Sequence, residues 1–202
     1  MHHTTSHENH ALHDFREESF SNTIFGFWLY LMTDCLLFAT LFCTFAVLHS
    51  QTANGPTSVQ IFDLKLVFTE TLILLLSSFT SGLALLASLK NKKSQMFLWL
   101  GLSFILGAMF VSIELFEFNS LIFEGASFQR SAFLSSYFTL VGTHGLHVSF
   151  GLLFLAVLIV QLIVCGITVE TFRRLVLFNM FWHFLDLVWI FIFTFVYLMG
   201  VV

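Results

Sequence analysis

Five long stretches of apolar residues limit what this sequence can fold into. They cover residues 24–49, 66–89, 95–118, 132–164 and 175–201. Each is long enough to cross a bilayer, which takes about 20 apolar residues in a helix. Only 10% of the residues are charged, whereas a soluble domain carries roughly a quarter. The sequence therefore predicts an all-α integral membrane bundle of five transmembrane helices over residues 24–202.

The residues before the first apolar stretch form a polar tail, 1–23, with five histidines (His2, His3, His7, His10 and His13). We expect this tail to be solvated and disordered, because such a segment buries too little apolar surface to fold. The first apolar stretch is longer than the hydrophobic region of a signal peptide, so we expect it to remain as a membrane anchor.

The basic residues predict an orientation, because cytoplasmic segments of membrane proteins are enriched in Lys and Arg. Two of them, Lys65 and Arg130, lie on one side of the predicted bundle. The other six lie on the side of the tail: Arg16, Lys90, Lys92, Lys93, Arg173 and Arg174. We therefore expect a cytoplasmic N-terminus and a periplasmic C-terminus. Nothing in the formal net charge of −4 suggests a nucleic-acid partner.

Eight ionisable residues fall within the apolar stretches: Asp34, Glu70, Glu114, Glu117, His144, His147, His183 and Asp186. A charge at mid-bilayer costs at least about 2.5–3.5 kcal/mol on insertion scales. These side chains should therefore be neutral, paired or near an interface. Glu114/Glu117, His144/His147 and His183/Asp186 are each three positions apart, so each pair shares one helix face, and we expect these faces to turn inward.

These residues have two possible roles. They can form hydrogen bonds between helices that fix the packing of the bundle, or they can take part in a function such as metal binding or proton transfer. A di-iron centre requires Glu-x-x-His motifs, which are absent from the sequence. Haem ligation is disfavoured because no second helix repeats a bis-histidine arrangement. A proton path is conceivable, but one five-helix chain lacks the paired halves of many transporters. We expect no catalytic, cofactor-binding or metal-binding residue in this chain.

Small residues predict where helices approach closely. One group lies in the second apolar stretch and the other in the fourth. Their members are Ser77, Ser78, Ser81 and Gly82, and Gly142, Gly145, Ser149 and Gly151. We further hypothesise that Asp34 hydrogen-bonds His144 or His147, since the glycines beside these histidines would permit a close approach.

Several motifs, in this order along the chain, resemble subunit III of the haem-copper oxidases. FGFWLYLMTDCLLFATLFCTFAVL (25–48) resembles its helix with a buried carboxylate, where Asp34 replaces the Glu of many relatives. ELFE (114–117) resembles the acidic end of a later helix. GTHGLHV (142–148) and FWHFLDLVWIFIFTFVYLMG (181–200) resemble the last two helices. The five helices, Asp34 and the His-rich tail are most similar to the ubiquinol oxidases of bo type.

The resemblance implies a non-catalytic subunit of a bacterial proton-pumping quinol oxidase in the inner membrane. Such a subunit packs directly against subunit I, which holds the haems and copper, in a complex with subunits II and IV. It also holds phospholipid and sustains proton uptake, so the eight ionisable residues would support packing, a lipid cleft and the proton environment. The alternatives are a menaquinol or cytochrome c oxidase, a free-standing proton-coupled transporter, and a membrane cytochrome b.

Overall fold

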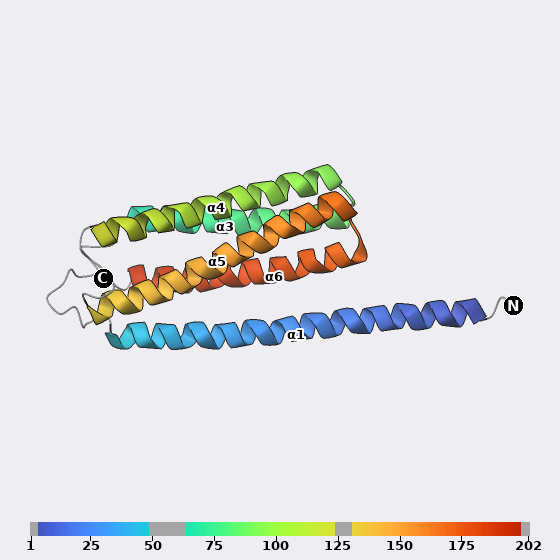
Figure 1. Cartoon of the computed structure of the whole chain (residues 1–202), viewed down its shortest axis with the longest axis horizontal. Helices are drawn as coiled ribbons and strands as arrows, with labels where there is room; N and C mark the ends of the chain where they lie inside the picture. The colour runs from blue at the N-terminus through green and yellow to red at the C-terminus, as the bar shows by residue number, and fades with distance from the viewer. Residues whose placement is uncertain (1–3, 49–63, 124–130, 199–202) are drawn as a thin grey trace. The chain divides into compact units, whose positions relative to one another are not determined.

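The computed structural model describes residues 4–48, 64–123 and 131–198 (Figure 1). Their helices are α1 (Thr4–Leu48), α3 (Leu64–Leu89), α4 (Lys93–Phe123), α5 (Ala132–Cys165) and α6 (Val169–Ile192), with a π-helix, η1 (Phe193–Leu198), continuing α6. By length and composition, five helices can cross a membrane: α1 from Phe20, α3 from Lys65, α4, α5, and α6 together with η1. The all-α fold with five membrane-spanning segments is therefore confirmed.

Two helix starts differ from the prediction. Helix α1 begins at Thr4, so the segment expected to be a disordered tail is helical from that residue. No Gly or Pro occurs between Thr4 and Thr23, so nothing in the sequence stops the helix from extending outward from its apolar part. Helix α6 begins at Val169 rather than at residue 175, and Arg173 and Arg174 therefore lie inside it and not in a connector.

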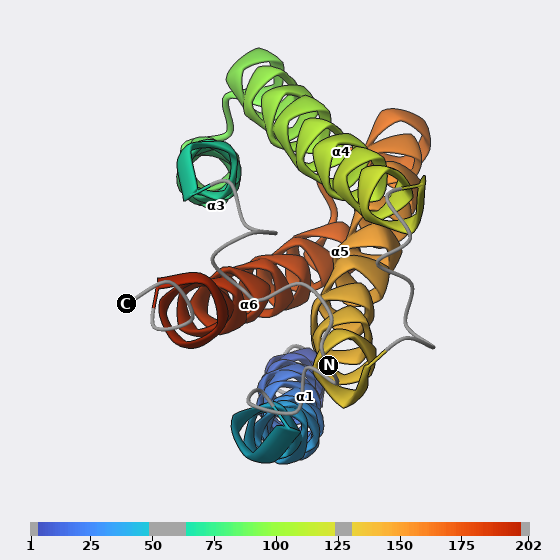
Figure 2. The ribbon, with the colours of Figure 1, turned by 90° about the vertical axis from the view of Figure 1, so that its left-hand side faces the viewer.

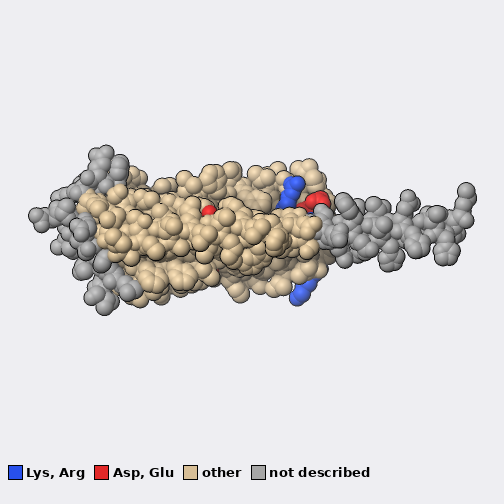
Figure 3. Space-filling view, turned by 90° about the horizontal axis from the view of Figure 1, so that it is seen from below, with Lys and Arg blue, Asp and Glu red and all other residues tan. Residues whose placement is uncertain are grey.

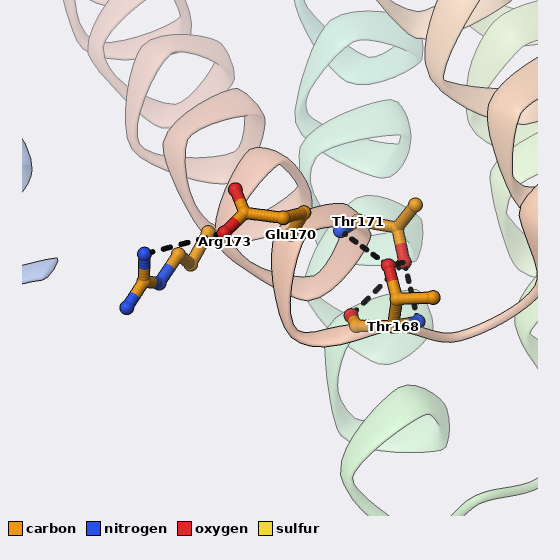
Figure 4. Close-up of polar contacts among 4 residues, drawn as sticks. All are labelled: Thr168, Glu170, Thr171 and Arg173. Carbon is orange, nitrogen blue, oxygen red and sulfur yellow. Dashed lines mark hydrogen bonds and ion pairs between the residues drawn. The ribbon is translucent and has the colours of Figure 1, made fainter. Parts of the chain in front are cut away.

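The early start of α6 is explained by a capping box (Figure 4). The Thr171 backbone N–H donates to Thr168 Oγ1 at 3.2 Å, and the Thr168 N–H donates to Thr171 Oγ1 at 2.7 Å. Together these bonds satisfy two backbone donors that a helix start leaves unpaired. Glu170 suits the positive end of the helix dipole and pairs with Arg173 at 3.4 Å.

The chain divides into two compact units, Met1–Leu36 and Leu37–Val202. The described part of the first unit is the N-terminal portion of α1, on which Phe25, Trp28 and Leu29 are exposed. In the second unit, α3 packs beside α4 and α6, and α5 packs beside α4 and α6 (Figures 1 and 2). The second unit is thus a bundle in which each of these four helices has two principal neighbours.

The core of the second unit is built around aromatic residues of α6. Trp182 fits between α4 and α5 because both helices carry glycine there. A Cβ added to Gly107 would lie 2.9 Å from the Trp182 ring, and one added to Gly151 would lie 2.8 Å from it. Trp189 packs edge-to-face on Phe110, with ring centroids 4.7 Å apart. The predicted close approach at Gly151 is confirmed, and Gly107 adds a second one.

The two connectors described in the second unit are short and lie at the same end of the bundle (Figure 1). Asn91 takes a left-handed conformation (φ 57°) in the turn between α3 and α4, and Gly166 (φ 69°) ends α5. Asn and Gly adopt this conformation more readily than other residues. On the face seen in Figure 3, Lys and Arg atoms gather at one end, and the surface between the ends is almost free of charge.

Candidate functional site

Helices α3 and α6 face each other through a row of hydrogen bonds between side chains, most of which are buried. Moving along the pair, Trp189 Nε1–H donates to Thr71 Oγ1 at 3.1 Å, Trp182 Nε1–H donates to Ser77 Oγ at 3.2 Å, and Ser81 donates to Asn179 Oδ1 at 3.2 Å. The row also includes a bond between Ser78 and His183. We call these eight residues the α3–α6 polar interface: Thr71, Ser77, Ser78, Ser81, Asn179, Trp182, His183 and Trp189.

The same row extends to α4 through a reciprocal serine pair. Ser77 Oγ–H can donate to the Ser103 carbonyl at 3.0 Å, and Ser103 Oγ–H can donate to the Ser77 carbonyl at 3.1 Å. The two hydroxyl oxygens are 3.2 Å apart, so either one can instead donate to the other. Both serines are fully buried. Small polar side chains thus hold three helices in close contact, as is common between membrane helices.

His183 and Asp186 meet the polar interface at the same serine. Ser78 Oγ lies 2.6 Å from His183 Nδ1, and the Asp186 side chain lies near the same serine. Asp186 is only 9% exposed, and its Oδ1 atom has no hydrogen-bond partner among the described residues. The predicted shared face of His183 and Asp186 therefore does turn towards α3, although the His183 side chain itself is exposed.

The glutamates gather at the opposite end of the bundle from the short connectors. Glu70 on α3 is fully buried and Glu114 on α4 is 4% exposed. Within the described residues, neither carboxyl group has a hydrogen-bond partner. Glu70, Glu114 and Glu117 lie within electrostatic range of one another, and we call these three the acidic cluster. The structure thus brings together three of the predicted residues.

Two tyrosines lie near the acidic cluster and were not predicted. The hydroxyl groups of Tyr137 and Tyr197 are 2.9 Å apart, and both residues are buried. Each is within electrostatic range of Glu70 and Glu117. This places polar groups from α5 and η1 beside carboxyl groups from α3 and α4.

The two histidines of α5 have different surroundings. His144 is fully buried, and its ring stacks on Trp189 with centroids 5.1 Å apart. Neither of its nitrogens has a hydrogen-bond partner among the residues that the structure describes. His147 is half-buried and its Nδ1–H donates to the Thr143 carbonyl at 2.7 Å. Phe38 contacts both rings, at 6.3 Å and 5.4 Å between centroids.

A cavity of about 320 Å³ lies between α4 and α5. Its lining is mostly apolar and includes Val111, Leu115, Phe118 and Leu146, with Glu114 as its one ionisable residue. A Cβ added to Gly145 would lie 2.8 Å from both Glu114 carboxyl oxygens. Gly145 therefore allows α5 to close over the carboxyl group, which confirms the predicted close approach at this glycine.

Asp34 belongs to the first unit and is only 7% exposed. His144 and His147 belong to the second unit. The hypothesised bond between Asp34 and one of these histidines therefore stays a prediction. Among residues 20–48, 65–123 and 131–198, whose side chains the structure describes, no three His, Cys, Asp or Glu side chains converge in a way that could hold a metal ion.

Sequence reasoning missed several members of the polar interior, namely Thr71, Ser103, Tyr137, Asn179, Trp182, Trp189 and Tyr197. For the tryptophans a signal was present. Trp in membrane proteins favours the interface with water, whereas Trp182 and Trp189 fall well inside the last apolar stretch. A tryptophan at that depth needs an acceptor for its indole N–H, and the serines and threonines of the apolar stretches are the candidate acceptors.

The chain is similar to known proteins over nearly its whole length. Residues 6–201 match the family described as cytochrome c oxidase subunit III. The cytochrome bo(3) ubiquinol oxidase subunit 3 of Pseudomonas aeruginosa is 55% identical over 195 residues, 96% of this chain and 93% of that protein. The cytochrome c oxidase subunit 3 of Bacillus sp. strain PS3 is 42% identical, over 90% of this chain and 87% of that protein. The quinol oxidase subunit 3 of Bacillus subtilis is 40% identical, over 99% of this chain and 98% of that protein.

Proposed function

Because the chain belongs to the cytochrome c oxidase subunit III family of the haem-copper oxidases, we propose that it is the non-catalytic third subunit of a bacterial ubiquinol oxidase. The complex oxidises ubiquinol, reduces oxygen to water and pumps protons across the inner membrane during aerobic respiration. The observation that carries this proposal is the 55% identity to a ubiquinol oxidase subunit 3. The identity to a cytochrome c oxidase subunit 3 is lower, at 42%.

The proposed role of the chain in the complex is structural. The α3–α6 polar interface supports this role, because its side chains bond one another across helices rather than converge on an open site. The eight ionisable residues then serve packing and the proton environment. Haems and copper belong to subunit I in this proposal, and this chain packs against subunit I in a complex with subunits II and IV.

Bound phospholipid is part of the proposal. The cavity between α4 and α5 has a mostly apolar lining, which suits a hydrocarbon chain. Leu115 and Leu146 beside it are 57% and 56% exposed, so an acyl chain can reach the cavity from the side of the bundle.

We propose that the N-terminus is cytoplasmic. In support, Lys90, Lys92 and Lys93 lie at or beside the turn between α3 and α4, and Arg173 and Arg174 lie in the first turns of α6, at the same end of the bundle. Lys65, at the start of α3, lies at the other end. An impermeant thiol reagent tests this in intact cells carrying Lys92→Cys or Thr57→Cys without the three native cysteines. We expect labelling at 57 and not at 92, and the reverse pattern would contradict the proposed orientation.

Affinity purification tests the proposed function. The tagged chain is extracted from membranes in a mild detergent, and the eluate is assayed for haem absorbance and for quinol oxidation by oxygen. We expect a larger haem-containing partner and oxidase activity to co-elute with the chain. Elution of the chain alone is the result expected of a free-standing transporter. A Soret band that remains with the separated chain would instead indicate a membrane cytochrome b.

A further inference from the structure

His183 is an exposed ionisable residue at the middle of a membrane span. It lies near the midpoint of the segment Val169–Leu198, which is long and apolar enough to cross a bilayer. Ionisable residues at that depth nearly always face the interior of a bundle. The surface around His183 is apolar, since Phe79 on α3 is 63% exposed and Leu187, one turn further along α6, is 53% exposed.

The imidazole is held in a fixed orientation against α3. Its Nδ1 atom bonds to Ser78 at 2.6 Å. Its Nε2 atom lies beside Gly82, since a Cβ added to this glycine would be 3.9 Å from Nε2. With one nitrogen bound and the ring supported along its side, Nε2 is presented at a defined place on the surface.

The hydrogen bond between Ser78 and His183 decides which ring nitrogen of His183 carries a hydrogen. A net charge on these three side chains would be costly in hydrocarbon, which leaves two neutral combinations. If both Asp186 and His183 are uncharged, the Ser78 hydroxyl hydrogen has Nδ1 as its acceptor, because Nδ1 is the hydrogen-bond partner of that hydroxyl group among the described residues. Ser78 then donates to Nδ1, and the ring hydrogen is on Nε2.

The second combination leads to the same result. If Asp186 is a carboxylate and His183 an imidazolium, both ring nitrogens carry hydrogen. Nδ1–H then donates to Ser78 Oγ, and Nε2–H again points outward. In both states the surface presents a hydrogen-bond donor for which hydrocarbon offers no acceptor.

We propose that the α3–α6 face around His183 is a docking surface for a transmembrane helix of another oxidase subunit, which supplies a carboxyl, amide or hydroxyl oxygen to Nε2–H. This inference rests on the proposed function, which supplies the partner subunits. Lipid headgroups lie at the membrane surface, so they do not reach the middle of the span. The complementary partner is therefore a protein segment that carries an acceptor at the depth of His183.

Photo-crosslinking within the complete complex tests the docking surface. A benzophenone amino acid replaces Leu187 beside His183, and in a matched control it replaces Leu153, which is 61% exposed on α5. We expect an adduct with another oxidase subunit from position 187 and none from position 153. Adducts at 187 with lipid only or with a second copy of this chain would overturn the inference, as would equal subunit adducts from both positions.

Substitutions at His183 test the donor. Gln keeps an N–H donor near the position of Nε2, whereas Leu removes it. We expect His183→Leu to weaken retention of the chain in the detergent-extracted complex on the order of tenfold, the range of one interhelical hydrogen bond, and His183→Gln to retain it. The helix content of each variant, measured by circular dichroism, serves as the folding control.

Equal retention of the Leu and Gln variants, with helix content unchanged, would overturn the inference while leaving the proposed function intact. Absence of every other oxidase subunit from the purified wild-type chain would contradict the proposed function itself.

Discussion

Most residues of the α3–α6 polar interface and of the acidic cluster are buried in the second unit, yet the polar atoms of the two regions differ in their hydrogen bonding. In the interface, short side chains and indole N–H groups form hydrogen bonds across helices at 2.6–3.2 Å. In the acidic cluster, the carboxyl oxygens of Glu70 and Glu114 have no partner among the described residues. The first region pairs its polar groups, whereas Glu70 and Glu114 in the second are buried without a hydrogen-bond partner among the described residues.

This difference indicates different physical roles. A paired hydrogen bond between helices stabilises the bundle modestly, whereas a buried polar group without a partner costs free energy. The interface therefore holds α3, α4 and α6 together. Glu70 and Glu114 do not stabilise the fold through hydrogen bonds with any of the described residues. Because isolated anions would be expensive at such a site, we expect Glu70 and Glu114 to be uncharged.

The largest effect is expected from Trp182→Ala in the polar interface. This change removes a ring that fills the space beside Gly107 and Gly151 and leaves Ser77 without its indole donor. We expect a loss of about 3–5 kcal/mol in the free energy of unfolding, as for other large-to-small core changes. Denaturant titration of the chain in micelles, followed by circular dichroism, measures it. Trp28→Ala, at a position 50% exposed in the first unit, is the control, and an equal loss there would contradict the account.

A smaller effect is expected from Ser77→Ala, which removes one hydroxyl group from the same interface. The Trp182 indole N–H loses its acceptor, and the reciprocal pair with Ser103 is broken on one side. We expect destabilisation by about 1–2 kcal/mol. Ser112→Ala is the matched control, because Ser112 is exposed and its hydroxyl donates to the Ala108 carbonyl of its own helix. An equal loss in the free energy of unfolding for both variants would show that the contact between helices at Ser77 does not contribute to stability.

The smallest effect is expected in the acidic cluster, from Glu70→Gln. Gln has nearly the shape of an uncharged Glu, so the free energy of unfolding should change by less than about 0.5 kcal/mol. The infrared carbonyl band of a protonated carboxyl group should weaken in this variant. A loss of several kcal/mol without any change in that band would show that Glu70 is an anion with a strong partner. The proposed difference between the α3–α6 polar interface and the acidic cluster would then be wrong.

The sequence was sufficient to predict the spans because their length and apolar content are local properties. The boundaries at Thr4 and Val169 were missed for different reasons: the tail contains no helix breaker, and the threonine capping box contains no acidic residue at its closing position. Pairs on one face, such as His183 with Asp186, could also be predicted from spacing alone.

Partners between helices could not be predicted in this way. Ser77 accepts a hydrogen bond from the Trp182 indole N–H because Gly107 and Gly151 leave room for the indole between α4 and α5. That arrangement depends on the relative positions of four helices, and spacing within one helix does not specify it. The same limit applies to Asp34, whose predicted bond to His144 or His147 joins the two units and stays a prediction.

The central claim is that this chain supports a quinol oxidase through packing and takes no part in its chemistry. The most direct test is the initial rate of quinol oxidation by the whole complex when Glu70, Glu114 and Glu117 are all replaced by Gln, with retention of the chain verified on a gel. We expect an initial rate close to that of the wild type. A loss of about a hundredfold or more with the chain retained, the size expected on removing a general acid or base, would contradict the claim.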